Sequence, residues 1–236
     1  MPEFTAQVRE LAERTESALG ALEQNDRWTE ALEIYHSAGT ELDALRVPRA
    51  DAAHKPARKL RAYLYLREAN ALRALGRHAE AAPLADLELS AAMASGDRLS
   101  IARAMFSLGS TCLANGEIER GLKLLDDSRP MFEHQDDPEH RQGLGWWYLI
   151  QADIGNAGLV PSTPEYALQA AEKALSILRP LENWPGIARA HAARARAYER
   201  LGNAAAARVA QTAEQMAQEM LRLKAASAPS SPPQNK

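Results

Sequence analysis

The sequence has few of the residues that favour β-strands, since Val, Ile and Thr together account for only 18 of its 236 residues. Alanine and leucine, which have high helix propensities, account for 47 and 30 residues. Sandwiches, barrels and doubly wound sheets draw heavily on β-branched residues, which are scarce in this chain. The composition therefore predicts an all-α protein.

Long apolar runs, cysteines and an excess of positive charge are also missing. No stretch of about 18 apolar residues occurs that could cross a bilayer, so we expect no membrane contact. The single cysteine, Cys112, cannot by itself form an internal disulfide or a thiolate zinc cage. A net charge of −3 gives no overall basic field, so we expect no nucleic-acid partner. The residues after Met1 show no secretory signal pattern, and together these absences indicate a cytoplasmic protein.

Apolar residues recur at helical spacing along almost the whole chain. Gly, Asn and Asp at the breaks between these segments fit left-handed C-caps and side-chain N-caps. Residues 227–236 are rich in Ser and Pro, and we expect this tail to be disordered. The pattern predicts ten helices, over residues 3–23, 28–45, 53–75, 78–95, 98–114, 118–133, 138–155, 164–179, 185–201 and 204–226.

The turns that join the predicted helices in pairs resemble one another. Segments 25–31, 75–81, 115–121 and 201–207 align, and each ends on a small residue. The sequence Ile-Ala-Arg-Ala occurs at 101–104 and again at 187–190. Gly76 and Gly116 are 40 positions apart, which predicts a repeat of that length. The alternative is a helical bundle without repeats.

This pattern resembles the tetratricopeptide repeat (TPR), with a large and then a small residue in mid-helix, a Gly at the turn and a small residue early in the second helix. Leu108, Gly109, Gly116 and Gly121 match it well. The spacing exceeds the usual length of about 34 residues, as in the long variants of kinesin light chains and of bacterial sensor or regulator proteins. The resemblance implies an all-α, right-handed superhelix of about five stacked helix pairs over residues 1–226. The pairs cover roughly residues 3–45, 53–95, 98–133, 138–180 and 185–226.

No catalytic signature is present, since the sequence has no phosphate-binding loop, dinucleotide turn, zinc-protease motif or nucleophile elbow. Cys112 has no basic neighbour on its helix face, so we expect a buried core residue. Residues 134–140 hold two histidines and three carboxylates, which could bind a divalent metal. Asp137 and Pro138 also fit the start of a helix, and we prefer this structural interpretation. We expect no enzyme, no metal site and no cofactor.

In the resemblance to TPR proteins, the first helices of the pairs line a concave groove. Residues 49–77 carry eight Lys/Arg against two Asp/Glu, whereas residues 3–43 carry ten acids against three Arg. Arg can grip carboxylates bidentately, Asn can hold a peptide backbone, and aromatic rings supply apolar contact area. In the alternative interpretation these arginines face solvent or pair with neighbouring acids. We predict that an extended acidic peptide is bound by Tyr63, Arg67, Asn70, Arg103, Phe106, Arg189 and Arg196.

Asn70 and Arg103 also occupy positions like those of the carboxylate clamp in chaperone-binding TPR proteins. The first pair has Glu13, Glu16 and Gly20 where that clamp needs Lys and Asn. We therefore do not expect this chain to bind chaperone tails.

Two apolar features lie in the second half of the chain. The aromatic run at 146–148 cannot face one way on a helix, so we expect two rings in the core and at least one outside it. The last helix carries an apolar stripe, which either caps the stack or pairs two copies as a homodimer. The stripe consists of Val209, Ala213, Met216, Met220 and Leu223.

The sequence therefore predicts a non-catalytic protein–protein interaction module with a protein or peptide partner. An alternative is a peptide-sensing regulator of bacterial type, which would act through a partner protein because no DNA-reading helix-turn-helix precedes the repeats. A thermal-shift screen with a peptide library would identify such a sensor, since one short sequence would raise its stability. A further alternative is an enzyme hidden in the groove or at residues 134–140, which a metal analysis would test.

Overall fold

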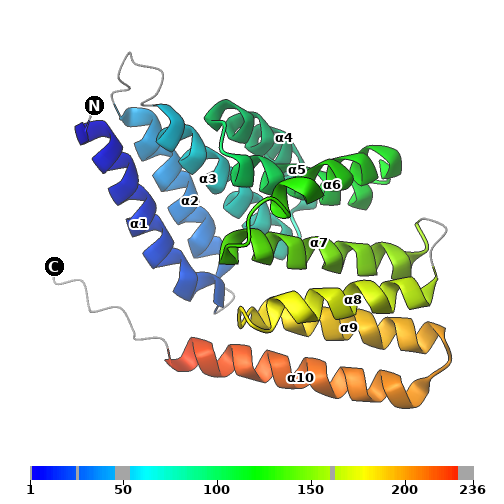
Figure 1. Cartoon of the computed structure of the whole chain (residues 1–236). Coiled ribbons are helices and arrows are strands. Elements are labelled where there is room, and N and C mark those ends of the chain that lie inside the picture. Colours follow the sequence, from blue (N-terminus) through cyan, green and yellow to red (C-terminus); the bar gives the residue numbers. More distant parts are fainter. Residues whose placement is uncertain (1, 25–26, 46–53, 160–162, 228–236) are drawn as a thin grey trace. The chain divides into compact units, whose positions relative to one another are not determined.

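The computed structural model describes residues 2–24, 27–45, 54–159 and 163–227, which form ten α-helices and no strand (Figure 1). All ten helices begin and end within two residues of the predicted ranges, which confirms the all-α fold class. Apart from Ser227, the predicted disordered tail lies outside the described residues. The helices are α1 (Pro2–Gln24), α2 (Trp28–Ala44), α3 (His54–Ala74), α4 (His78–Ser95), α5 (Arg98–Ala114), α6 (Ile118–Phe132), α7 (Pro138–Ala157), α8 (Pro164–Leu178), α9 (Trp184–Arg200) and α10 (Ala204–Ser227).

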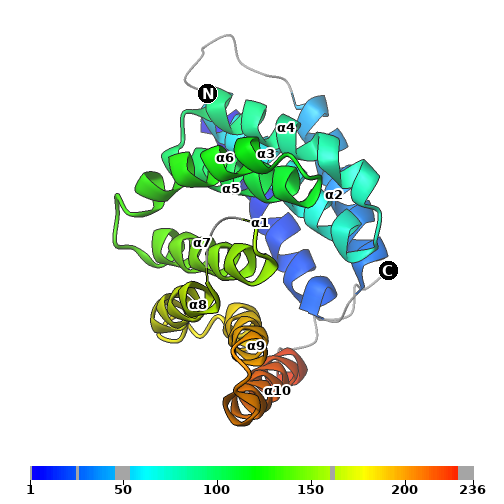
Figure 2. The ribbon, with the colours of Figure 1, turned by 90° about the vertical axis from the view of Figure 1, so that its right-hand side faces the viewer.

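The chain divides into two compact units, Met1–Trp147 and Tyr148–Lys236, with the boundary inside α7. In the first unit α1 packs on α2, α3 on α4 and α5 on α6, and α2 and α4 each contact the following helix. In addition, α1 contacts α3 and α3 contacts α5, so the first helices of successive pairs lie side by side. In the second unit α8 packs on α9 and α9 on α10 (Figure 2). Helix pairs stacked in this way bury apolar faces that a single pair could not cover.

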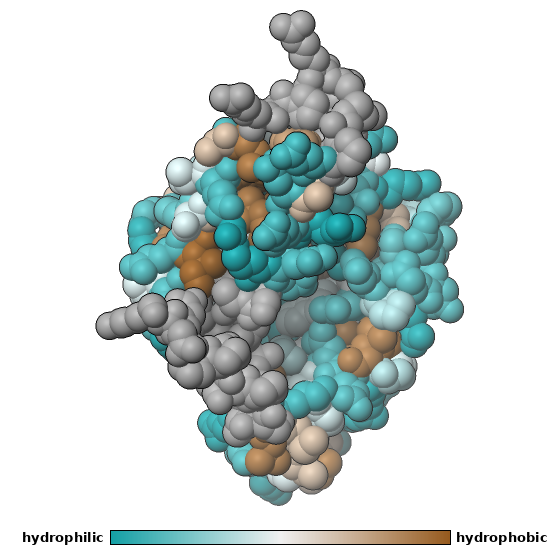
Figure 3. Space-filling model, turned by 90° about the vertical axis from the view of Figure 1, so that its left-hand side faces the viewer, coloured by the Kyte–Doolittle hydropathy of each residue, from teal (hydrophilic) through white to brown (hydrophobic). Residues whose placement is uncertain are grey.

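The surface is mostly hydrophilic on the face shown in Figure 3, where hydrophobic residues form separate patches. Such patches are normal on folded proteins, because polar groups cannot cover the whole surface. Among the described helices, none combines the length and the apolar character that crossing a bilayer requires.

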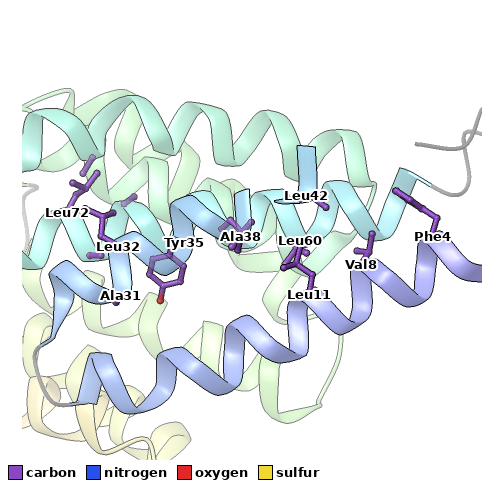
Figure 4. Packing of buried hydrophobic residues seen from close by; sticks show 14 residues of the cluster. Phe4, Val8, Leu11, Ala31, Leu32, Tyr35, Ala38, Leu42, Leu60 and Leu72 are labelled. Carbon is purple, nitrogen blue, oxygen red and sulfur yellow. The ribbon is translucent and has the colours of Figure 1, made fainter. Parts of the chain in front are cut away.

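The first two pairs share a core that spans α1, α2, α3 and the start of α4 (Figure 4). Phe4, Val8 and Leu11 follow one another on α1 at spacings of four and three, so they share one face of the helix. Tyr35 of α2 and Leu64 of α3 are almost completely buried in the same cluster. Fully burying one such large apolar side chain contributes about 1.5–3 kcal/mol, so this cluster holds the first three helices together.

Glycines lie at the turns that end the first helices and at the closest contact between α5 and α6, and both positions require a residue without a side chain. Gly76, Gly116 and Gly202 end the first helices of their pairs with φ of 74°, 83° and 72°, a left-handed conformation that glycine adopts without strain. Gly109 and Gly121 face each other between α5 and α6. A Cβ added to Gly121 would lie 2.9 Å from the Gly109 carbonyl oxygen. The glycines predicted at the turns, and those predicted at the contact between α5 and α6, are therefore confirmed.

Candidate partner-binding groove

A cavity of about 850 Å³ lies in the first unit, on the side formed by the first helices of the pairs. Residues of α1, α3, α5 and α7 form its walls, and a single residue of the second helix α4 reaches it. The lining residues are Thr5, Val8, Arg9, Ala12, Glu16, Pro56, Lys59, Leu60, Ala62, Tyr63, Leu66, Arg67, Glu88, Ser100, Arg103, Glu139 and Gln142. We call this cavity the groove.

Three of the predicted peptide-binding residues line the groove, namely Tyr63, Arg67 and Arg103. The Arg67 guanidinium lies 5.8 Å from the centre of the Tyr63 ring, and its Nε donates to Tyr35 Oη at 3.3 Å. Arg103 Nη2 donates to Glu139 Oε2 at 3.1 Å. All three side chains are half-buried, so their orientations are set by packing rather than by solvent.

Asn70 and Phe106 are not among the residues that line the groove. Asn70 Oδ1 accepts a hydrogen bond of 3.0 Å from Arg73 Nη2, and Arg73 Nη1 donates to Thr111 Oγ1 near the end of α5. The Phe106 ring packs edge-on against Phe132, with 6.4 Å between the ring centres. Both side chains therefore support the packing of neighbouring helices.

Arg189 and Arg196 lie in the second unit, on α9, and both bind the same carboxylate. Their Nη2 atoms lie 2.6 and 2.7 Å from the two oxygens of Asp153 on α7. The next arginine on this helix, Arg200, donates to the carbonyl oxygens of Gly155 and Asn156. These contacts match the alternative in which the arginines pair with groups of their own chain.

Cationic side chains outnumber acidic ones in the groove. The cationic lining residues are Arg9, Lys59, Arg67 and Arg103. Lys59 Nζ also lies 3.2 Å from Oδ1 of Asp97, which is not a lining residue. The acidic lining residues are Glu16, Glu88 and Glu139. With four cationic side chains against three acidic ones, the charge of the lining favours an anionic ligand over a cationic one.

Glu88 differs from every other charged residue of the groove because its side chain is 2% exposed. Its Oε2 atom has no hydrogen-bond partner among the described residues. Burial raises the pKa of this carboxyl to about 8, and Ser107, Arg73 and Arg103 offset the effect only in part. At neutral pH the carboxyl is therefore mostly protonated and can donate a hydrogen bond.

Glu88 was not among the site residues predicted from the sequence, although a signal was present. The second helices bury residues at equivalent positions, seven after the first buried small residue: Ala38 follows Ala31, and Ser128 follows Gly121. Glu88 follows Ala81 by the same seven positions. An acidic residue at this interior register position indicates a buried carboxyl.

The two other candidate sites of the sequence are structural in character. Cys112 is 2% exposed, as predicted for a core residue, and burial raises the pKa of its thiol. Asp137 Oδ1 accepts hydrogen bonds from the backbone N–H groups of Glu139 and His140, so the predicted helix start at Pro138 is confirmed. Within the described ranges, no group of three or more His, Cys, Asp or Glu could hold a metal ion.

The three aromatic side chains at 146–148 are not buried to the same extent, because they cannot all face one way on a helix. Trp147 is 4% exposed, and its Nε1 donates to the Leu125 carbonyl oxygen at 2.9 Å. Trp146 and Tyr148 are half-buried, and Lys173 Nζ lies 5.3 Å from the centre of the Tyr148 ring. Only one ring of the run is thus fully in the core, where two were expected.

Comparisons with known proteins support the repeat architecture. No protein-family model matches the sequence, and no curated protein matches it either. BtubC (BKLC) from P. vanneervenii has a similar structure, with a TM-score of 0.53 and 16% identity over 100% of this chain and 93% of the other. A second similar structure is that of a Podosopora anserina protein described as a kinesin light chain with nearly identical TPR-like repeats. The match has a TM-score of 0.48 and 17% identity, over 92% of this chain and 97% of the other. The likeness to BtubC shows that this chain has the fold of a TPR-like repeat protein.

Proposed function

We propose that this chain is a non-catalytic, cytoplasmic interaction module that holds an extended acidic segment of a partner protein in the groove. The observation that carries the proposal is the pair of half-buried guanidinium groups of Arg67 and Arg103 in a cavity of about 850 Å³. A TPR-like fold fits this role, since it presents extended surfaces to other polypeptides.

The chemistry of the lining supports an acidic peptide. Arg forks bind carboxylates through two parallel hydrogen bonds, and their fixed geometry selects carboxylates over other groups. Tyr63 and Leu66 add apolar contact area beside Arg67. Lys59 and Arg9 extend the positive charge along the wall, so an extended segment with several acids finds more than one cation.

Fluorescence anisotropy with labelled hexaglutamate tests the proposal. We expect the wild type to bind this probe, and binding to weaken as salt rises from 50 to 300 mM because exposed charges are screened. The double variant Arg67→Ala/Arg103→Ala should lose about tenfold or more in affinity, since two charge-assisted contacts disappear.

The matched control is Arg77→Ala/Arg120→Ala, which removes the same charge from the start of α4 and α6 outside the groove. It should bind hexaglutamate as tightly as the wild type. Equal affinities of the wild type and the groove variant, with both folded by circular dichroism, would contradict the proposal.

A further inference from the structure

The second helices of the first four pairs bury one equivalent position, and α4 places a carboxyl there. In three other pairs the equivalent residues are Ala38, Ser128 and Ala174, each buried. Glu88 occupies this position in the second pair. It is also the residue through which α4 reaches the groove.

The Glu88 side chain meets two requirements of a ligand-binding group. It is almost completely buried, and Oε2 lacks a hydrogen-bond partner among the described residues. A buried oxygen that makes no hydrogen bond has lost its hydration without full compensation, so a ligand group that bonds to it would be favoured. Since the side chain also lines the cavity, a molecule bound there lies next to Glu88.

The charged groups around Glu88 come from four helices and decide which ligand fits. Lys59, Arg67 and Arg73 belong to α3, and Arg103 belongs to α5. The acidic groups on the same cavity are Glu139 of α7 and Glu16 of α1, where Arg9 adds a further cation. A cationic ligand would meet four lining cations, whereas a carboxylate would be attracted by them.

We propose that Glu88 acts in its protonated form as a hydrogen-bond donor to a carboxylate of the acidic partner, so that the groove binds partner and proton together. This inference rests on the proposed function and adds a proton-dependent subsite to it. The Glu88 O–H donates to the ligand carboxylate, and no covalent bond is made or broken. When Glu88 is ionised, the two carboxylates repel, and binding then requires the uptake of one proton from solvent.

Binding of labelled hexaglutamate at pH 6.5 and pH 9.0 tests this inference. The side chains of the probe stay ionised over this range, so a change in affinity reports on the protein. With the carboxyl half-protonated near pH 8, we expect the wild type to bind about tenfold more weakly at pH 9.0.

The variant Glu88→Gln should bind equally well at both pH values, because the amide stays neutral and keeps an N–H donor. Glu88→Ala, which places the residue of the first and fourth pairs at this position, should lose the pH dependence as well. Glu119→Gln removes an exposed acid outside the groove and should keep the tenfold change.

The outcomes separate the two proposals. If the wild type and all variants bind hexaglutamate at neither pH, both the acidic-peptide groove and the role of Glu88 are overturned. If binding is pH-independent in the wild type, or if Glu88→Gln and Glu88→Ala keep the tenfold change, only the role of Glu88 is overturned. Tighter binding of labelled hexalysine than of hexaglutamate, rising with pH, would also overturn it.

Discussion

Arg103 of α5 and Glu139 of α7 form an ion pair at the edge of the groove, with 3.1 Å between Nη2 and Oε2. Glu139 is 65% exposed, whereas Arg103 is 34% exposed. Glu139 is therefore the more exposed partner, and it binds the guanidinium that a partner carboxylate would bind in the proposed complex. A bound acidic segment must compete with Glu139 or share Arg103 with it.

The variant Glu139→Gln should therefore bind hexaglutamate about two- to fivefold more tightly than the wild type, because removing an exposed competitor is worth up to about 1 kcal/mol. Anisotropy titrations at 50 mM salt measure the change. Glu119→Gln serves as the control and should leave the affinity unchanged. Weaker binding by Glu139→Gln would show that Glu139 supports the site instead of covering it.

The close approach of α5 and α6 depends on Gly109 and Gly121. A methyl group on Gly109 would lie 3.0 Å from the Gly121 carbonyl oxygen, which cannot move without shifting the helix. We expect Gly109→Ala to lower the free energy of unfolding by about 1–3 kcal/mol, as overpacking in a core does. Urea titration followed by circular dichroism measures it.

Gly39 of α2 provides the matched control for this change. A Cβ there would meet only the flexible end of Arg61, at 3.1 Å. Alanine is the better helix former, so Gly39→Ala should be neutral or stabilising by up to about 1 kcal/mol. Equal losses in both variants would mean that the contact between Gly109 and Gly121 does not limit the approach of the helices.

The helices and turns could be predicted because their signals are local. The caps, the helical apolar period and the turn glycines all act within a few residues, and α5 begins and ends where predicted, at Arg98 and Ala114. The small residues at Gly109 and Gly121 were also identified, because the repeat places them at fixed positions.

The site could be predicted only in part, because its contacts join residues more than 30 positions apart. Arg67 and Arg103 were predicted from their positions on the helix face that lines the groove, and both line it. The same reasoning also predicted Phe106, which instead packs on Phe132. The pairing of Arg189 with Asp153 depends on how successive hairpins stack, which no local pattern fixes. Glu88 was missed because only first helices were expected to supply groove residues.

Glu88 also makes the stability of the protein depend on pH. Its carboxyl holds a proton in the folded state up to a pKa of about 8, whereas an unfolded glutamate releases it near 4.3. Between these values the folded state binds the extra proton, so its stability falls as pH rises towards 8. Relative to Glu88→Gln, the wild type should lose on the order of 3 kcal/mol between pH 5.0 and pH 8.5. Urea titrations of both proteins measure this difference, and parallel pH profiles would contradict the prediction.

The titration of His191 should have the opposite effect, so that the stability of the protein falls as the pH drops below neutral. Burial lowers its pKa to about 4, and the nearby Arg194 and Arg179 add to this. The unfolded imidazole takes up a proton near 6.5, so unfolding binds a proton between these values and stability falls as pH drops. From pH 7.5 to 4.5 the wild type should lose about 1–2 kcal/mol more than His191→Gln. An equal loss in both proteins, measured by urea titration, would show that His191 is not the group responsible.

The apolar stripe of α10 lies on the surface, so homodimerisation through this helix stays a prediction that can be tested directly. Val209 is 71% exposed and Met216 is 66% exposed.

If two copies pair through this stripe, burying it supplies the driving force, and a charge at its centre should oppose dimerisation. Sedimentation equilibrium should then give twice the mass of one chain for the wild type and a single-chain mass for Met216→Glu. The neighbouring Gln215→Glu adds the same charge at an exposed polar position and should remain dimeric. A single-chain mass for the wild type at all concentrations up to about 100 μM would rule out a stable dimer, because its affinity would then be weaker than about −5.5 kcal/mol.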